Sequence, residues 1–280
     1  MIGPWRKGLR MHQCLALIMA WVFLSQGTLC ADESWQQIKG KHFVVFYQSA
    51  KEKDLAQKVL REAERYYDRI GERIGYQRVS KFWTWDERVR IVLFRDSQTF
   101  AAETGQPLWS LGYAARDSQV FHSHMIATYP QEQGFLDGLL PHEISHLILY
   151  DFIPDRRQLP VWFEEGIAQL EEADKGRRAD EFMRHLIDQD QYIRLDFLMR
   201  WDIRTEHDPL KVEVFYAQSL SLVRFMLKQY GQRSFQRLCR ELRDGHDFIS
   251  ALRKAYPGRI GNLSDLEKQW VRSFKGGGII

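Results

Sequence analysis

The segment Leu139–Leu149 places two histidines four positions apart in a strongly apolar run. Its sequence, Leu-Leu-Pro-His-Glu-Ile-Ser-His-Leu-Ile-Leu, is typical of a helix that begins near a proline. Four positions along an α-helix correspond to a rotation of about 400°. His142 and His146 therefore leave the same helix face one turn apart and can bind one metal ion. Glu143 stands beside the first histidine, where it can take a proton from water.

A carboxylate further along the chain completes a possible ligand set. Eighteen residues separate His146 from Glu165, within Leu-Pro-Val-Trp-Phe-Glu-Glu-Gly-Ile-Ala. Two histidines and one glutamate leave the fourth tetrahedral position of a zinc ion open for water, as in catalytic sites. Pro154 and Pro160 end the first helix and permit a second to run back toward it. Glu164 replaces Glu165 as the ligand if this second helix is rotated by one residue.

The charge of the chain argues against nucleic-acid binding. The chain has 280 residues, with 40 Lys+Arg and 37 Asp+Glu. The first 31 residues contain Arg6, Lys7 and Arg10 and no acid, so residues 32–280 carry 37 basic and 37 acidic groups. A neutral body lacks the basic field on which nucleic-acid binding usually depends.

Residues 1–31 have the pattern of a signal peptide. A basic start precedes the apolar run Cys14–Leu24, which has roughly half the 20 residues that a transmembrane helix needs. We therefore expect export to the periplasm or the extracellular space, with no stable membrane span after cleavage. An uncleaved leader would instead anchor the protein in the membrane. Removal of the leader leaves Cys239 as the one cysteine, which excludes an intramolecular disulfide.

The remaining chain divides by its periodicity into two parts. Residues 32–134 are predicted to form an N-terminal α/β lobe, and residues 135–280 a helical catalytic region. The first part contains expected strands at 42–47, 88–94 and 114–123 and expected helices at 51–74 and 97–103, the second closed by Gly105.

The motifs together resemble the gluzincin group of zinc metallopeptidases. His142-Glu143-x-x-His146, eighteen residues and Glu165 in Trp-x-x-Glu-Gly-x-Ala carry this resemblance. The downstream segments 215–225 and 230–231 are similar to the peptidase MA-like family, over about residues 135–275. The resemblance implies an α+β zincin-like fold, one Zn²⁺ ion bound by His142, His146 and Glu165, and Glu143 as the general base. It also implies a polypeptide substrate along an edge strand, for which 114–123 is the candidate.

Two features depart from the family pattern. The Gly-x-Met-Glu-Asn stretch of the zinc aminopeptidases is absent upstream of His142, which weakens an aminopeptidase assignment. The position four after the third ligand often holds an acid that orients a histidine, and here it is Gln169. An amide can still accept a hydrogen bond from an imidazole, so Gln169 is expected beside a ligand.

Several further residues are candidates for the site or its surroundings. Tyr216 is the preferred catalytic donor to the oxyanion, with packing between helices as its alternative role. His207, a loop histidine, is the second candidate. His122 and His124 are interpreted as the end of a strand near the cleft, and the acids Glu171 and Glu172 as a solvated helix face.

The sequence therefore predicts an α+β, zincin-like fold: a small mixed sheet with helices, an active-site helix, and a mainly helical C-terminal lobe. The leading function is an exported zinc metallopeptidase. The alternatives are a non-catalytic exported binding module of the same fold and a zinc hydrolase of a non-peptide amide. The oligomeric state, the cleaved bond and the choice between endo- and exopeptidase stay open.

Overall fold

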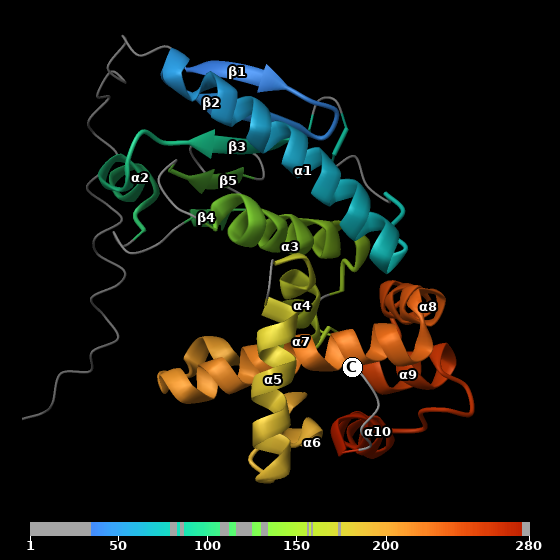
Figure 1. Cartoon of the computed structure of the whole chain (residues 1–280). Helices are drawn as coiled ribbons and strands as arrows, with labels where there is room; N and C mark the ends of the chain where they lie inside the picture. Colours follow the sequence, from blue (N-terminus) through green and yellow to red (C-terminus); the bar gives the residue numbers. More distant parts are fainter. Residues whose placement is uncertain are drawn as a thin grey trace, which may run out of the picture. The chain divides into compact units, whose positions relative to one another are not determined.

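A five-stranded mixed sheet forms the first half of the fold (Figure 1). The computed structural model describes residues 35–78, 83–84, 87–106, 112–115, 125–129, 134–155, 157, 159–172 and 175–275. The strand order is β1-β2-β3-β5-β4, and both outer pairs, β1 with β2 and β4 with β5, are antiparallel. The strands are β1 (Gln36–Lys39), β2 (Phe43–Tyr47), β3 (Val89–Leu93), β4 (Gly112–Ala115) and β5 (Met125–Thr128).

The central strands are parallel and nearly continuous in apolar residues. β2 pairs with β3 and β3 with β5 in parallel, and most of their side chains are buried. Such runs are typical of strands that are covered on both faces. The strands expected at 42–47 and 88–94 are confirmed as β2 and β3. Of the strand expected at 114–123, residues 114 and 115 belong to β4, an edge of the sheet, and residues 116–123 lie outside the described part.

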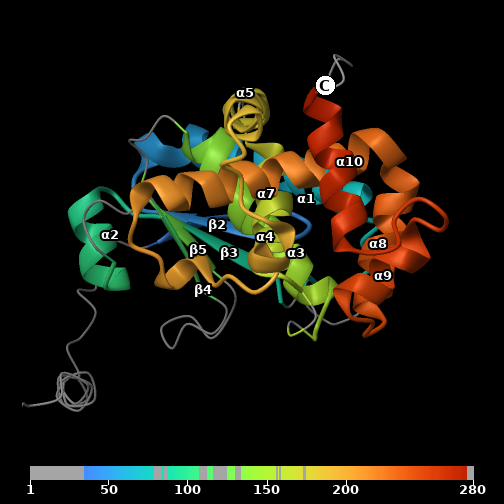
Figure 2. The ribbon, with the colours of Figure 1, turned by 90° about the horizontal axis from the view of Figure 1, so that it is seen from below.

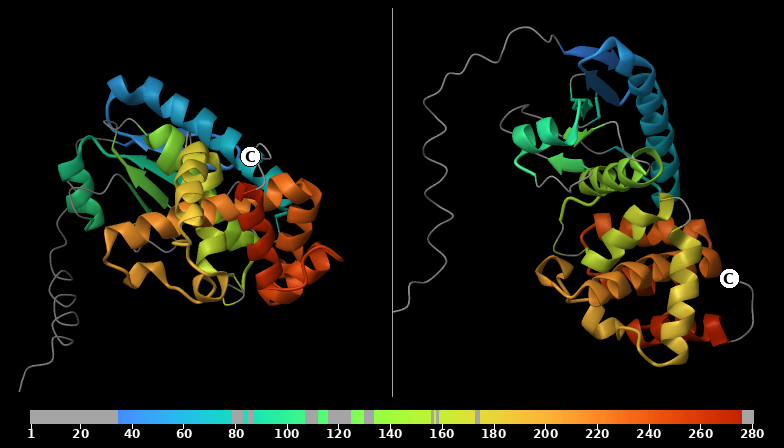
Figure 3. Two further views of the ribbon diagram at one scale, coloured as in Figure 1. Left: turned by 60° about the horizontal axis from the view of Figure 1, so that its bottom comes forward. Right: turned by 60° about the vertical axis from the view of Figure 1, so that its left-hand side comes forward.

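Helix α1 (Lys53–Ile74) packs on β2 and also contacts α3, as Figures 1 and 3 show. A short 3₁₀ turn, η1 (Ala50–Glu52), precedes it, with a capping box in which Ser49 and Glu52 each accept from the other's backbone. The left-handed Gly75 (φ 71°) ends the helix. The expected helix at 51–74 is thereby confirmed, as is the one at 97–103, which is α2 (Ser97–Thr104) closed by Gly105.

After the sheet, the chain forms two helices that are joined by a segment containing Pro154 and Pro160. A short π-helix, η2 (Phe135–Leu139), leads into α3 (Leu140–Phe152). Helix α4 (Val161–Ala168) begins directly after Pro160. Pro154 lies just beyond the end of α3, in agreement with the expected break. Because the two helices contact each other, the start of α3 and the middle of α4 are brought together.

The second half of the unit is helical, and α7 (Pro209–Tyr230) lies at its centre, in contact with α4, α5 and α8 (Figure 2). The other elements are η4 (Gln169–Glu171), α5 (Lys175–Asp188), α6 (Leu195–Leu198), η5 (Ile203–Thr205), α8 (Gln232–Arg243), α9 (Phe248–Ala255) and α10 (Leu263–Lys275). The predicted α+β fold, with a small mixed sheet and a mainly helical second half, is confirmed.

Gly166 allows α4 and α7 to approach closely. A Cβ atom at this position would lie 2.5 Å from the carbonyl oxygen of Ser219 and 2.7 Å from Cγ2 of Val223. Only glycine therefore fits at this contact without a shift of the helices. Since Gly166 follows Glu165 directly, the close contact fixes the helix turn that carries the expected third ligand.

The described residues from Gln36 onward form one compact unit. The expected boundary between residues 134 and 135 stays a prediction, as does the assignment of residues 1–31 as a signal peptide. Within the described ranges, no helix is long and apolar enough to cross a membrane.

Candidate metal centre

The first turns of α3 carry both histidines of the motif. Pro141 occupies the first turn of this helix, where its missing N–H needs no partner. The Ile144, Leu147 and Ile148 side chains are buried in the core, so the opposite stripe of α3 turns His142 and His146 toward α4. Both histidines are half-buried.

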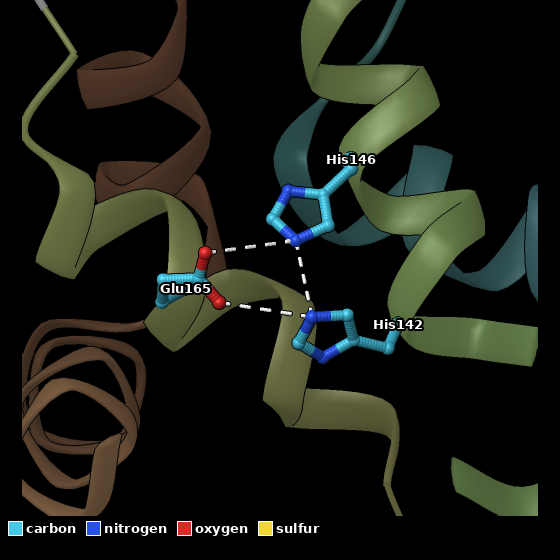
Figure 4. A group of neighbouring side chains, drawn as sticks. All are labelled: His142, His146 and Glu165. Carbon is cyan, nitrogen blue, oxygen red and sulfur yellow. Dashed lines mark hydrogen bonds and ion pairs between the residues drawn. The ribbon is translucent and has the colours of Figure 1, made fainter. Parts of the chain in front are cut away.

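Glu165 of α4 faces the two imidazoles (Figure 4). The Nε2 atoms of His142 and His146 are 3.1 Å apart. One carboxylate oxygen of Glu165 lies 3.6 Å from His142 Nε2, and the other lies 3.8 Å from His146 Nε2. Two imidazole nitrogens and one carboxylate group, from two helices, thus converge on one point.

These distances fit a small tetrahedral cation. A zinc ion binds nitrogen and oxygen ligands at about 2.0–2.1 Å, which places two ligand atoms of a tetrahedron about 3.4 Å apart. The three separations lie on both sides of this value. The donor set, two imidazoles and one carboxylate, also has the composition of a catalytic zinc site.

The outer nitrogens of both histidines contact carboxylates. His142 Nδ1 lies 3.0 Å from Oε1 of Glu172, and His146 Nδ1 lies 2.8 Å from Oε1 of Glu164. With a proton on each Nδ1, both Nε2 lone pairs point at the shared centre, which is the tautomer that a metal requires. The structure thereby separates the roles of two consecutive residues, since Glu165 faces the Nε2 atoms and Glu164 faces Nδ1.

The interpretation of Glu171 and Glu172 as a solvated face is wrong. Their side chains are only 3% and 9% exposed, respectively. Glu172 contacts His142 and Lys175, while Glu171 forms ion pairs with Arg69 and Arg73 of α1. The chain leaves the helix at η4, so these acids turn inward instead of continuing an exposed face.

The centre is rich in negative charge, and this shifts several pKa values. Burial raises the pKa of Glu165, and the charges of Glu164 and Glu143 add to this against the opposing effect of the histidines. Burial opposes charging of His146, but the hydrogen bond to Glu164 and the charges of Glu165 and Glu143 outweigh it and raise the pKa of His146. Protons and a metal cation would therefore compete for these side chains, because a ligand binds metal in its deprotonated form.

Glu172 shows the opposite shift. Burial opposes its ionisation, but the hydrogen bonds with His142 and Lys175 outweigh burial and lower the pKa of Glu172. Its carboxylate therefore remains charged and can accept a hydrogen bond from the Nδ1–H group of His142.

The expectation that Gln169 accepts a hydrogen bond from a ligand histidine is wrong. Its Nε2 atom donates to the backbone carbonyls of Glu165 and Tyr216, at 3.1 and 3.2 Å. Gln169 thus connects α4 to α7, and its side chain is buried between them. The acids next to the imidazoles are Glu164 and Glu172, one position before and seven positions after Glu165.

Tyr216 lies on α7 within the electrostatic reach of the site. Burial raises the pKa of Tyr216 to about 12, and the charges of Glu165 and Glu172 contribute to the shift. The side chain is half-buried, and its ring contacts Phe215 edge-on, with ring centroids 5.5 Å apart. A phenol in this environment keeps its proton at neutral pH and is able to donate a hydrogen bond.

Three other histidines, His207, His122 and His124, were candidates for the site or its surroundings. His207 is exposed on the loop before α7, and its backbone N–H donates to Oε1 of Glu206 at 2.9 Å. Among the described residues, its hydrogen bonds stay within this loop, and its role as an oxyanion donor stays a prediction. His122 and His124 lie outside the described residues.

Sequence reasoning missed the two carboxylates that orient the imidazoles. Glu172 lies seven positions after Glu165, but α4 ends at Ala168 and η4 follows it, so helix periodicity does not predict where this side chain points. Glu164 also lacks a signal, because only the rotation of α4 decides which of the two adjacent acids faces Nε2.

Comparison with protein families gives an independent result. A family model described as the peptidase MA superfamily matches residues 87–275, more than half of the chain. The match begins just before β3, includes α3, α4 and η4, and ends with α10. Among curated proteins, none matches this chain.

Proposed function

Because this chain belongs to the peptidase MA superfamily, we propose that it is an exported metallopeptidase that uses one Zn²⁺ ion to hydrolyse peptide bonds. The observation that carries the proposal is the convergence of His142, His146 and Glu165, whose ligand atoms all lie within 4.8 Å of one another. This set leaves one tetrahedral position for water, which favours a catalytic over a structural site.

A bound zinc ion lowers the pKa of its coordinated water toward about 7 and polarises the substrate carbonyl. Glu143 acts as the general base in the proposed mechanism. Its carboxylate takes a proton from the attacking water and returns it to the leaving amine nitrogen. The position of Glu143 supports this role, since the residue is half-exposed on α3 and its charge reaches both His146 and Glu165.

Tyr216 donates a hydrogen bond to the oxygen of the carbonyl that is attacked. The raised pKa of its phenol supports this, because a donor must keep its proton while negative charge develops on the substrate. Gln169 holds the backbone of Tyr216 and of Glu165 with one amide group, so the donor and the third ligand are positioned together.

The substrate is a polypeptide, and the protein acts outside the cytoplasm. The basic start and short apolar run of residues 1–31 support export to the periplasm or the extracellular space. If the leader is not cleaved, the same protein acts as a membrane-anchored enzyme on that side.

The substitution Glu143→Gln tests the proposal. Purified wild type and variant are compared for bound zinc and for hydrolysis of casein and of a peptide library, with and without chelator. The expected result is one zinc in both proteins and hydrolysis by the wild type alone. Glu213→Gln, at an exposed position on α7, is the matched control and should behave as wild type.

Other results separate the alternatives. A wild type that binds zinc and cleaves no peptide contradicts the peptidase proposal. Cleavage of a non-peptide amide under the same conditions would then indicate the corresponding hydrolase, and inactivity toward both would favour a binding module. Unchanged hydrolysis in Glu143→Gln removes Glu143 from the mechanism.

A further inference from the structure

Two arginines of α1 hold the carboxylate of Glu171 in the interior. Arg69 and Arg73 are four positions apart, so they project from the same face of the helix. Arg69 forms an ion pair with Oε2 of Glu171, and Nε of Arg73 lies 2.8 Å from Oε1. The guanidinium of Arg69 also stacks over the Tyr66 ring, 4.9 Å from its centroid. We call these three residues, Arg69, Arg73 and Glu171, the α1–η4 clamp.

The burial of this carboxylate requires its partners. The side chain of Glu171 is 3% exposed, whereas those of Arg69 and Arg73 are 39% and 33% exposed. An isolated buried carboxylate is strongly unfavourable, and removal of one member of a buried pair leaves an uncompensated charge. The two arginines therefore fix the position of η4 against α1.

The residue next to the clamp faces the metal centre. Glu172 caps the end of η4 with extended backbone angles, φ −73° and ψ 126°, so its side chain departs from the direction of Glu171. Its Oε1 lies 3.0 Å from Nδ1 of His142, and its other oxygen forms an ion pair with Lys175. One peptide link thus joins the clamp to the carboxylate that orients the first histidine.

Helix α1 contacts both sides of this arrangement. It packs against α3, which carries His142, and through the clamp it holds η4, which positions Glu172. Helix α1 thus contacts both elements whose side chains meet at this point, α3 with His142 and η4 next to Glu172, and it contributes no ligand of its own.

From this geometry we propose that Glu171 is a positioning residue of the metal centre, which acts through Glu172 to set the orientation and tautomer of His142. The clamp holds η4 at the distance where Glu172 accepts a hydrogen bond from the Nδ1–H group of His142. The Nε2 atom of His142 is thereby directed toward the ion. The inference rests on the proposed metal site and assigns to it a determinant far from the HExxH motif in sequence.

Zinc affinity measured by competition with a chromophoric chelator tests the proposal in four proteins: wild type, Glu171→Gln, Glu172→Gln and the double variant. Loss of an outer carboxylate typically weakens metal binding by about 10- to 100-fold. We expect Glu172→Gln to fall in this range and Glu171→Gln to weaken binding by about tenfold. Because Glu171 acts through Glu172, the double variant should bind zinc as weakly as Glu172→Gln, and not more weakly.

The matched control is Glu267→Gln. Glu267 is also buried, pairs with Arg194 at 3.1 Å and accepts from the backbone N–H of Leu195 at 2.6 Å, on α10 and away from η4. We expect this variant to lose thermal stability and to keep wild-type zinc affinity. A second readout uses metal-free protein: ¹⁵N shifts of the His142 ring should show one Nδ1-protonated tautomer in the wild type and a mixture in Glu171→Gln.

The possible results distinguish a failure of the α1–η4 clamp from a failure of the metal site itself. Wild-type zinc affinity in Glu171→Gln, or fold losses that multiply in the double variant, would overturn the role of the clamp alone. A wild type without zinc affinity would overturn the metal site and this inference together. If Glu171→Gln does not fold, Arg69→Gln and Arg73→Gln replace it, since each leaves one ion pair. Both should then bind zinc more weakly than Glu267→Gln, and equal affinity would contradict the proposal.

Discussion

Glu164 Oε1 lies 2.8 Å from Nδ1 of His146, while the adjacent Glu165 faces Nε2 of the same ring at 3.8 Å. Two consecutive carboxylates of α4 thus contact the two nitrogens of one imidazole. The first fixes the proton on Nδ1, and the second joins the centre toward which Nε2 points. The rotation of α4 about its axis is therefore as important for the site as the HExxH motif on α3.

The substitution Glu164→Gln should lower zinc affinity by about tenfold or more, because His146 loses the charged acceptor of its Nδ1 proton. Chelator competition measures the change. Glu181→Gln is the control, since Glu181 is 64% exposed and forms a surface pair with Arg177. Equal zinc affinity in the two variants would show that Glu164 does not orient His146.

Gly166→Ala should destabilise the fold by about 1–3 kcal/mol, because the new methyl group overlaps with the Ser219 carbonyl and with Val223 of α7. Urea unfolding measures the free energy. Gly71→Ala on α1 is the control, since its Cβ would meet only ordinary contacts, the nearest at 3.5 Å, and alanine favours the helix. A loss of stability in Gly71→Ala that equals the loss in Gly166→Ala would contradict the close α4–α7 contact as the cause.

The metal-free protein should become less stable as the pH rises above about 6.5, the pKa of histidine in the unfolded chain. The pKa of His146 is raised in the fold by Glu164 and by the charges of Glu165 and Glu143, against the opposing effect of burial. A group with a raised folded-state pKa contributes stability below its unfolded pKa, about 6.5 for histidine, and this contribution is lost as the pH rises through the folded value.

Zinc needs the deprotonated nitrogen, so the gain in Tm on zinc addition should increase over the same pH window. Calorimetry of chelator-treated and zinc-loaded samples gives both curves. The variant His146→Gln should lose this increase. A zinc-dependent gain in Tm that is constant across the window in the wild type would be inconsistent with His146 as a ligand.

Tyr216→Phe should reduce kcat by about 100-fold and leave zinc affinity unchanged, because it removes a hydrogen-bond donor to the developing oxyanion. Steady-state kinetics on a cleaved peptide, with metal analysis of the same sample, separates the two effects. Tyr192→Phe is the control, since that hydroxyl accepts a hydrogen bond from Arg194 on the surface. A wild-type kcat in Tyr216→Phe would leave His207 as the remaining candidate donor.

Local patterns were sufficient for several parts of the fold. The helix breaks at Pro154 and Pro160, the left-handed end at Gly105, and the apolar strands β2 and β3 follow from short-range chemistry. Strands β1 and β5 were not predicted. Only four residues long, β1 is mostly exposed, so it lacks the apolar signal of a core strand.

The sequence indicated the three candidate ligands, but it did not indicate how the residues around them are arranged. The spacing of His142 and His146 follows from the turn of an α-helix, and the resemblance to the gluzincins indicated Glu165 as the third ligand. Glu171 and Glu172 resembled an exposed acidic pair, because no local pattern shows that η4 turns toward α1. Gln169 was misassigned for the same reason, since its buried position depends on the packing of α7.

Zinc content and affinity of the purified protein, measured side by side for wild type and Glu165→Gln, test the central claim most directly. The account predicts one tightly bound zinc ion per wild-type chain, removable by chelator, and greatly weakened binding in the variant, which loses the carboxylate that completes the ligand set. A wild type that binds no zinc, or a Glu165→Gln variant that binds it as tightly as the wild type, would contradict the account.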